Sequence, residues 1–597
     1  MTNPKFRRSA FAVVAVALVS AGACASGGGA AMKASDASPI VSVDPPTPDP
    51  RVGLRAGVDD PGMALWNLRL VSNTPSPEGF VGVTNSDLAF TGNYVIQGNY
   101  NGFIVWDVSN PAKPKLRKPY LCPASQSDVS VYNNLLFVSG EGLTGRIDCG
   151  SQGVPEPVSK DRLRGIRIFD ISDFDNPKYI ANVQTCRGSH THTVVTDPKD
   201  SENVYIYVSG SAGVRSPEEL PGCSNLSPEE DPNSALFRIE VIRVPLKAPQ
   251  NAAIVTSPRI FTGLGPAPQR TAETQGRPQN ANRPQRARTG PTQCHDITVY
   301  PAVGLAGGAC GGYGLLLDIS DVANPKRLTA VADTNFSFWH SATFSNDGSK
   351  VLFTDEWGGG RAPRCRATDA YEWGADAIFT IENGQMHFKS YYKMPAAQTE
   401  VENCVAHNGS LIPIPGREVM VQGWYQGGVS VFDWTDPMNP KEIAFFDRGP
   451  LDASRLTSAG SWSVYWYNGY IYNSEIARGL DVLELTPSPH ISQNEIDAAK
   501  TVVYRQLNPQ EQPKMVWPPS FALSRAYVDQ LERSRGLSAD RIAAVRGALQ
   551  SAERQTGQAR RDTLARLASE LEAEASRSRD AAKVRLLVDS LRQLNGP

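Results

Sequence analysis

Histidine is scarce in this chain, and its few positions suggest a site for a transition metal ion. Only seven histidines occur among 597 residues. Four of them stand where a short run of alternating apolar residues begins, and a fifth lies two residues before one of these: His192, His295, His340 and His407, with His190. Carboxylates end a neighbouring run, as Asp355 and Glu356. Neutral imidazole together with a carboxylate is a donor set that suits Zn, Cu, Fe or Mn.

A repeated phrase predicts the architecture that brings these residues together. An apolar run ends in Asp, a turn follows, and Pro-Lys comes next; the copies span residues 102–115, 165–178, 314–326 and 428–441. One such unit cannot bury its own apolar face, so the units must stack on one another. Alternation between turn signals predicts an all-β seven-bladed β-propeller over residues 61–490. The seventh blade shows only three strands, and we expect residues 64–71 to supply its fourth strand and close the ring.

In a propeller the predicted ligands share one mouth of the central channel. Inner strands surround the channel and all begin at that mouth, so His192, His295, His340 and His407 converge there. His190 lies two residues before His192 and returns to the same face of the strand. Second strands run back to the same mouth and bring Asp355 and Glu356, which with His190 are supporting or alternate ligands. The alternative is a polar ring or ligand pocket that holds no metal ion.

The positions of eight cysteines fit the same propeller geometry. An even number of cysteines besides Cys24 is typical of an oxidising compartment. In the propeller, one member of each pair precedes an inner strand and the other lies in a loop after a second strand. We therefore predict the disulfides Cys122–Cys149, Cys186–Cys223, Cys294–Cys310 and Cys365–Cys404. The rival interpretation is that a thiolate ligates a metal beside His295.

The two ends of the chain differ in composition from the repeats. Residues 1–24 have a basic start, a short apolar run and small residues, and resemble a bacterial lipoprotein signal with Cys24 as the lipidated residue; plain secretion is the alternative. Residues 25–60 are predicted to be a flexible tether to the membrane anchor, 269–293 a disordered insertion and 491–518 a linker. Residues 519–597 carry short helical apolar stripes and predict an α-helical bundle, with an oligomerising coiled coil as the alternative.

The repeat resembles a known class of propeller. It resembles the LVIVD-repeat β-propellers of bacterial surface proteins and is similar to the propeller module labelled choice-of-anchor B. Residues 294–300, 339–357 and 406–408 carry the resemblance, which extends over residues 60–490. It implies the fold but no general activity.

Two hypotheses for function follow. One is an exported, lipid-anchored propeller that binds a small ligand or a protein partner at the disulfide-stapled mouth. The other is a metal-dependent extracytoplasmic enzyme, an oxidoreductase or hydrolase, that uses the histidine ring. A net charge of −2 gives no electrostatic case for nucleic acid as a partner.

Overall fold

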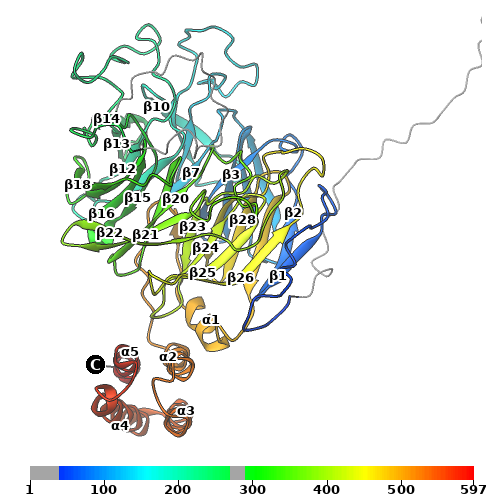
Figure 1. The fold of residues 1–597 in the computed structure, drawn as a ribbon. Helices are drawn as coiled ribbons and strands as arrows, with labels where there is room; N and C mark the ends of the chain where they lie inside the picture. The colour runs from blue at the N-terminus through cyan, green and yellow to red at the C-terminus, as the bar shows by residue number, and fades with distance from the viewer. Residues whose placement is uncertain (1–38, 269–289, 597) are drawn as a thin grey trace, which may run out of the picture. The chain divides into compact units, whose positions relative to one another are not determined.

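Seven antiparallel sheets form a closed propeller in this computed structural model, which describes residues 39–268 and 290–596 (Figure 1). Blades one and two comprise β3 (Asn85–Thr91), β4 (Tyr94–Asn99), β5 (Gly102–Asp107), β6 (Lys115–Leu121), β7 (Val129–Tyr132), β8 (Leu135–Gly140), β9 (Gly165–Asp170) and β10 (Lys178–Gln184). Blades three and four comprise β11 (His192–Val195), β12 (Asn203–Val208), β13 (Glu240–Pro245), β14 (Ala253–Thr256), β15 (Cys294–Tyr300), β16 (Leu305–Cys310), β17 (Tyr313–Asp318) and β18 (Lys326–Val331). Blade five comprises β19 (Trp339–Phe344), β20 (Lys350–Asp355), β21 (Asp376–Glu382) and β22 (Gln385–Tyr392).

The last two blades are completed by strands from the start of the chain. Blade six holds β23 (Gly409–Ile412), β24 (Val419–Gly423), β25 (Val429–Asp433) and β26 (Lys441–Arg448), with β1 (Met63–Trp66) added outside β26. Blade seven holds β27 (Ser461–Tyr467), β28 (Tyr470–Glu475) and β29 (Gly479–Leu485), and β2 (Leu68–Thr74) is its fourth strand. The predicted closing strand is therefore confirmed, and it splits at Asn67 to serve two blades. The inner strand of each blade contacts the next, and β27 contacts β3, so the ring has no open end.

The repeated aspartates perform the turn role that their position predicts. In the loop after the third strand, each carboxylate accepts the backbone N–H two residues on, at distances of 2.8–2.9 Å, in Asp107, Asp170, Asp318 and Asp433. Apolar side chains of successive blades pack together between these turns. For example, Phe103 and Val105 of blade one share a core with Val129 and Leu136 of blade two. This packing is what a single blade lacks when it stands alone.

Part of the predicted tether packs against blade six. Arg51 is buried, and its guanidinium donates to both carboxylate oxygens of Glu442, at 2.9 and 2.8 Å, and lies 3.8 Å from the ring centroid of Phe445. Ile40 makes a parallel bridge to Trp66. A bidentate arginine–carboxylate pair over an aromatic ring holds this segment where composition alone suggests a free chain.

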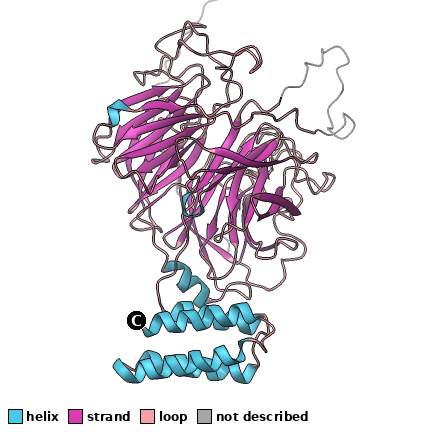
Figure 2. Ribbon diagram, turned by 90° about the vertical axis from the view of Figure 1, so that its left-hand side faces the viewer, coloured by secondary structure: helices cyan, strands magenta, loops and turns pink. Residues whose placement is uncertain are grey.

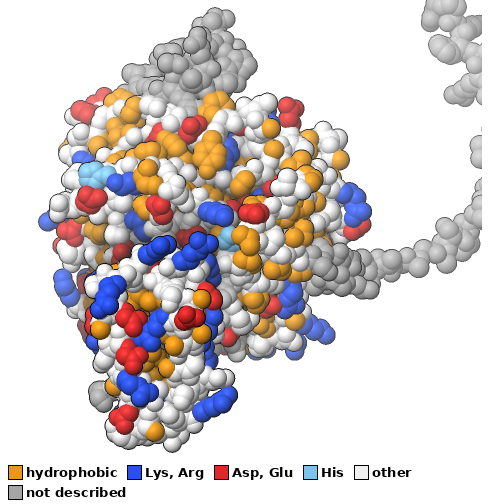
Figure 3. All heavy atoms as spheres, turned by 60° about the horizontal axis from the view of Figure 1, so that its bottom comes forward, with side chains coloured by type: hydrophobic (Ala, Val, Ile, Leu, Met, Phe, Trp, Pro, Cys, Tyr) orange, Lys and Arg blue, Asp and Glu red, His pale blue; other side chains and the backbone are white. Residues whose placement is uncertain are grey.

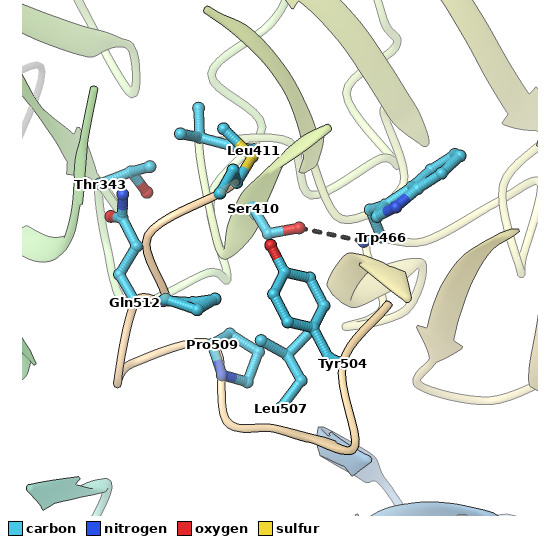
Figure 4. A pocket seen from close by; sticks show the side chains of 11 residues that line it. Thr343, Ser410, Leu411, Trp466, Tyr504, Leu507, Pro509 and Gln512 are labelled. Carbon is cyan, nitrogen blue, oxygen red and sulfur yellow. Dashed lines mark hydrogen bonds between the residues drawn. The ribbon is translucent and has the colours of Figure 1, made fainter. Parts of the chain in front are cut away.

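The segment expected to be a linker crosses the far end of the channel. Its strand β30 (Gln506–Leu507) adds to β3, and residues 508–512 then bond to inner strands of blades one, two, four and five. Asn508 bonds the N–H and C=O of Val131, Gln512 bonds those of Phe344, and Gln510 donates to Asp87 at 2.7 Å. Figure 4 shows side chains of this segment and of blades five to seven around a small cavity of about 30 Å³. We call residues 506–515 the cross-channel segment.

The rest of the C-terminal region is helical (Figure 2). It contains α1 (Gln493–Lys500), α2 (Phe521–Arg533), α3 (Ala539–Arg554), α4 (Gly557–Ala575) and α5 (Ala581–Asn595). The predicted stripes of α2–α5 pack into one apolar core, with Leu531, Val545, Leu571 and Leu587 fully buried.

On the face drawn in Figure 3, basic and acidic side chains are interspersed, so this face has no large region of one charge. No helix among residues 39–268 and 290–596 is long and apolar enough to cross a membrane.

Candidate metal centre

Four imidazoles line one mouth of the channel, each contributed by a different blade. The ring centroids of His190 and His295 are 4.4 Å apart, those of His295 and His340 are 4.0 Å apart, and those of His340 and His407 are 4.2 Å apart. The four residues stand at the starts of the inner strands of blades three to six. The convergence predicted from the repeat is therefore present, with His190 rather than His192 as the member from blade three.

Bulges aim these side chains into the channel. In β15, Cys294 pairs with Cys310 and Ile297 with Gly308, so His295 and Asp296 together face one residue of β16. In β19 the same irregularity falls at His340. A β-bulge inserts a residue and redirects the side chains beside it, which strict two-residue alternation does not anticipate. The equivalent positions in the other blades are Ser86, Ser127 and Trp462, and of these Ser86 and Trp462 border the same small cavity as the histidines.

His192 lies apart from this ring. Its Nδ1 is 2.8 Å from Ser139 Oγ and 3.3 Å from Asp128 Oδ2, and its ring lies edge-on to Phe137. Burial lowers the pKa of His192 to about 3, so the side chain is neutral. Strand β11 begins at His192, so His190 precedes the strand, and the two residues do not share a face as regular alternation would require.

Donor atoms from two adjacent blades approach one another closely enough to hold a metal ion. His295, His340 and Glu356 each offer one atom within 4.8 Å of the others, and all three residues are buried. Glu356 Oε2 lies 3.9 Å from His340 Nε2, and its Oε1 lies 3.8 Å from His407 Nε2. Two or three imidazoles and one carboxylate could therefore bind one ion, and Glu356, predicted as a supporting ligand, lies between the histidines.

Hydrogen bonds orient two of the histidines. His295 Nδ1 lies 2.9 Å from Asp296 Oδ1, and His407 Nδ1 bonds the backbone carbonyl of Trp462. In each case Nδ1–H is the donor, which leaves the Nε2 lone pair for another partner. Carboxylate and carbonyl acceptors behind a ligating histidine are the usual support of a metal site. The Nδ1 of His340 has no hydrogen-bond partner among residues 39–268 and 290–596.

Burial dominates the electrostatics of the mouth. Burial, together with His295 and His407, holds the pKa of His340 well below its usual range, and burial lowers the pKa of His407 to about 3. Burial would also lower the pKa of His295, but Asp296, Glu356 and Glu141 together outweigh burial and raise the pKa. Burial raises the pKa of Glu356 despite nearby His295 and a hydrogen bond from Tyr425. Neutral His340 and His407 keep their lone pairs, and an ionised Glu356 needs a cation beside it.

The remaining predicted ligands have structural partners. Both ring nitrogens of His190 are used, Nδ1 by Glu141 at 2.5 Å and Nε2 by the Gln126 amide at 2.9 Å. Burial would raise the pKa of Glu141, but His190 and Ser211 lower it to about 2. Asp355 accepts backbone N–H groups from Ser337, Phe338 and Gly374 and so shapes the surrounding loops. Burial raises the pKa of Asp355 to about 7 despite these bonds.

A cavity of about 650 Å³ adjoins the ring. Its lining includes residues that do not belong to the repeated pattern, among them Tyr100, Arg361, Tyr425 and Trp462. Tyr425 donates its O–H to Glu356 Oε1 at 2.5 Å and has a φ of 52°, a left-handed conformation that is rare for a large side chain. The sequence could have pointed to Tyr425 and Trp462, because they lie at the same ends of strands as the histidines.

Four disulfides secure the loops around this mouth. They join Cys122–Cys149, Cys186–Cys223, Cys294–Cys310 and Cys365–Cys404, which are the predicted pairs. No thiolate therefore remains beside His295 for metal binding, because Cys294 is bonded to Cys310. Cys24 and the predicted signal lie outside the described residues, as does most of the predicted insertion.

Comparison with known proteins identifies the repeat in one blade. The LVIVD repeat model matches residues 84–121, which is blade one. No curated protein matches the chain. Among solved structures, the Pseudomonas aeruginosa periplasmic gluconolactonase is 11% identical, with 73% of this chain and 98% of that one covered and a TM-score of 0.39. Kuenenia stuttgartiensis hydrazine synthase is 10% identical (68% and 98% covered, TM-score 0.40), and a functionally unknown Desulfotomaculum acetoxidans protein is 11% identical (64% and 96%, TM-score 0.37). Similarities at this level carry no functional argument.

Proposed function

We propose that the protein is an exported metalloprotein that binds a small molecule at a metal ion in the channel mouth. His295, His340, His407 and Glu356 would hold the ion. The observation that carries the proposal is the convergence of buried imidazole nitrogens on one buried carboxylate, with Glu356 oxygens 3.9 and 3.8 Å from His340 Nε2 and His407 Nε2. No lysine or arginine pairs with Glu356 among the described residues, and a bound cation would stabilise its carboxylate.

The donor set favours a transition metal. Imidazole and carboxylate suit Zn, Cu, Fe or Mn, whereas calcium sites are built from oxygen ligands. Such an ion would supply Lewis-acid polarisation of a bound oxygen group or activation of water or oxygen. The chain's own contribution is to orient the imidazoles through Asp296 and the Trp462 carbonyl and to provide a cavity of about 650 Å³ for the ligand.

A second candidate function is catalysis at the same ion, by an oxidoreductase or hydrolase. The Tyr425 hydroxyl favours it, because it lines the cavity and lies 2.5 Å from Glu356 Oε1. A phenol in that place is positioned to give a proton to a metal-bound group. Burial and the charge of Glu356 raise the pKa of Tyr425 well above its usual range, so it acts from its protonated form.

Export is supported by the four disulfides, which are typical of oxidising compartments. The proposal also includes lipid attachment at Cys24 and a similarity of the propeller to the choice-of-anchor B module. A protein partner at the mouth, in place of a small molecule, would be the conclusion if the site held neither metal nor ligand.

Elemental mass spectrometry of the purified mature protein tests the metal site. We expect about one equivalent of a transition metal after reconstitution, and its loss in His340→Ala and in Glu356→Gln. Two variants serve as controls and should retain the metal. His387→Ala changes an exposed histidine of β22, and His192→Gln changes the buried histidine that lies outside the ring. Absence of metal in folded, disulfide-bonded wild-type protein, or equal loss in His192→Gln, would overturn the proposal.

A further inference from the structure

One arginine at the cavity differs from its neighbours in having no partner. Arg361 lines the cavity next to the histidines and is exposed. Among residues 39–268 and 290–596 it makes no hydrogen bond or ion pair, whereas nearby Arg364 and Arg366 pair with Asp369 and Arg187 bonds loop carbonyls. An arginine held at a concave site without a carboxylate is available to a ligand from solution.

The loop that carries Arg361 is tied to the proposed metal site. Gly358, Gly359 and Gly360 all adopt left-handed backbone, with φ of 82°, 66° and 66°. A Cβ on Gly360 would lie 2.2 Å from the Tyr425 hydroxyl and 2.7 Å from Glu356 Oε1. The loop therefore packs directly on the Tyr425–Glu356 pair, and Arg361, the next residue, lines the cavity wall.

The charges around the cavity favour an anion once a metal is bound. A divalent ion with Glu356 as its single carboxylate keeps a net positive charge, and a bound cation is usually the largest local charge in such a site. Glu141, the other carboxylate lining the cavity, is already engaged by His190 and Ser211. Arg361 adds a second positive group, and its charge acts across the same space, because it lowers the pKa of Tyr100 against the larger opposing effects of burial and Glu141.

The rest of the wall suits a hydroxylated carbon skeleton. Tyr100, Phe338 and Trp462 provide aromatic surface, and Ser125, Gln126, Ser211 and Gln293 provide hydroxyl and amide groups. A few polar groups set among aromatic walls is the usual make-up of a small-molecule site. The volume of about 650 Å³ admits a molecule of the size of a monosaccharide.

On these grounds we propose that the cavity binds a hydroxylated carboxylic acid, such as a sugar acid. Its carboxylate would pair with the planar guanidinium of Arg361, and an oxygen at its other end would face the metal. This inference rests on the proposed metal site and names the class of ligand that the site takes.

The test compares D-glucuronate with D-glucose, two probes that differ at C6, where the first has a carboxylate and the second a hydroxymethyl group. Binding to the metal-reconstituted mature protein is followed by tryptophan fluorescence, since Trp462 lines the cavity, and by calorimetry. We expect glucuronate to bind at least about tenfold more tightly than glucose. Arg361→Gln should remove most of that preference. Arg361→Lys should retain part of it, because a lysine keeps the charge but lacks the planar pair of N–H donors that a guanidinium offers to a carboxylate. Arg366→Gln, which alters a paired arginine of the same loop region, should leave it unchanged.

Metal content measured on the same samples separates the two proposals. If metal is bound but glucuronate binds no better than glucose, or neither binds, the ligand class is wrong and the metal site stands. Equal preference for glucuronate in Arg361→Gln and wild type would also overturn the inference. If the protein holds no metal yet shows an Arg361-dependent preference for glucuronate, the ligand class stands and the metal proposal fails.

Discussion

Replacing Asp296 by asparagine tests whether the carboxylate behind His295 supports a metal ligand. Asp296 Oδ1 lies 2.9 Å from His295 Nδ1, its Oδ2 has no hydrogen-bond partner among the described residues, and the residue is 1% exposed. The neutral amide can still accept the Nδ1–H, but the bond loses its charge assistance, and charge-assisted bonds are about twice as strong as neutral ones. Loss of such supporting partners costs about 10- to 100-fold in metal affinity. Because the asparagine keeps one acceptor, we expect a loss near the lower end, about tenfold.

The assay is competition for Zn²⁺ with a chromophoric chelator at fixed pH. Asp87→Asn is the matched control, since Asp87 holds the equivalent place in blade one and is also buried. It accepts from the Leu88 N–H, the Tyr465 hydroxyl and Gln510, and it bonds no histidine. In a His295→Ala background, Asp296→Asn should cost nothing further, because it acts through that imidazole. Equal affinity in Asp296→Asn and wild type, or an equal loss in Asp87→Asn, would refute the reasoning.

Three further predictions concern the cross-channel segment and the glycine loop. Gln512→Ala leaves the buried N–H and C=O of Phe344 without their 2.9 Å partners. A lost buried partner costs about 1–3 kcal/mol, so amide exchange at Phe344 should quicken about 5- to 150-fold, while Gln558→Ala, on the exposed surface of α4, should leave it unchanged. Burial raises the pKa of Glu511 to about 7 from 4.5, so the folded protein binds the proton more tightly and loses stability as pH rises from about 4.5 to 7. Glu511→Gln should then raise the free energy of unfolding at pH 8 by at most about 3 kcal/mol, measured by urea denaturation, and should change it little at pH 4. Equal effects at both pH values would contradict this. Gly360→Ala should weaken metal binding, because a Cβ there meets the Tyr425 hydroxyl, whereas Gly213→Ala, with no atom within 4 Å of a new Cβ, should not.

Most of the propeller could be predicted from local patterns. The Asp turn that closes each third strand, the alternation of apolar residues and the cysteine spacing are short-range features, and they predicted the blades and the four disulfides. Even the closing strand could be anticipated, because a three-stranded blade leaves an open edge that an unassigned apolar run can cover.

The cross-channel segment shows where local patterns stop being informative. Residues 506–515 are polar and contain two prolines, a composition typical of linkers, and their partners include backbone groups of Val131, Val299 and Phe344. Glutamine and asparagine side chains that bond backbone groups far away in sequence leave no periodic signal. The same holds for Arg51, whose bidentate partner Glu442 lies 391 residues away.

The repeat alone predicts that histidines from several blades gather at one mouth of the channel. It does so because residues at one phase of a repeat occupy one level of the ring. Which of these histidines face each other depends on contacts that form only in the folded chain. Bulges in β15 and β19 turn His295 and His340 inward, and His190 joins them while His192 bonds Ser139. Folding also places Glu356, Tyr425 and Arg361 around the same space, since loops from different blades meet there through packing that no single segment encodes.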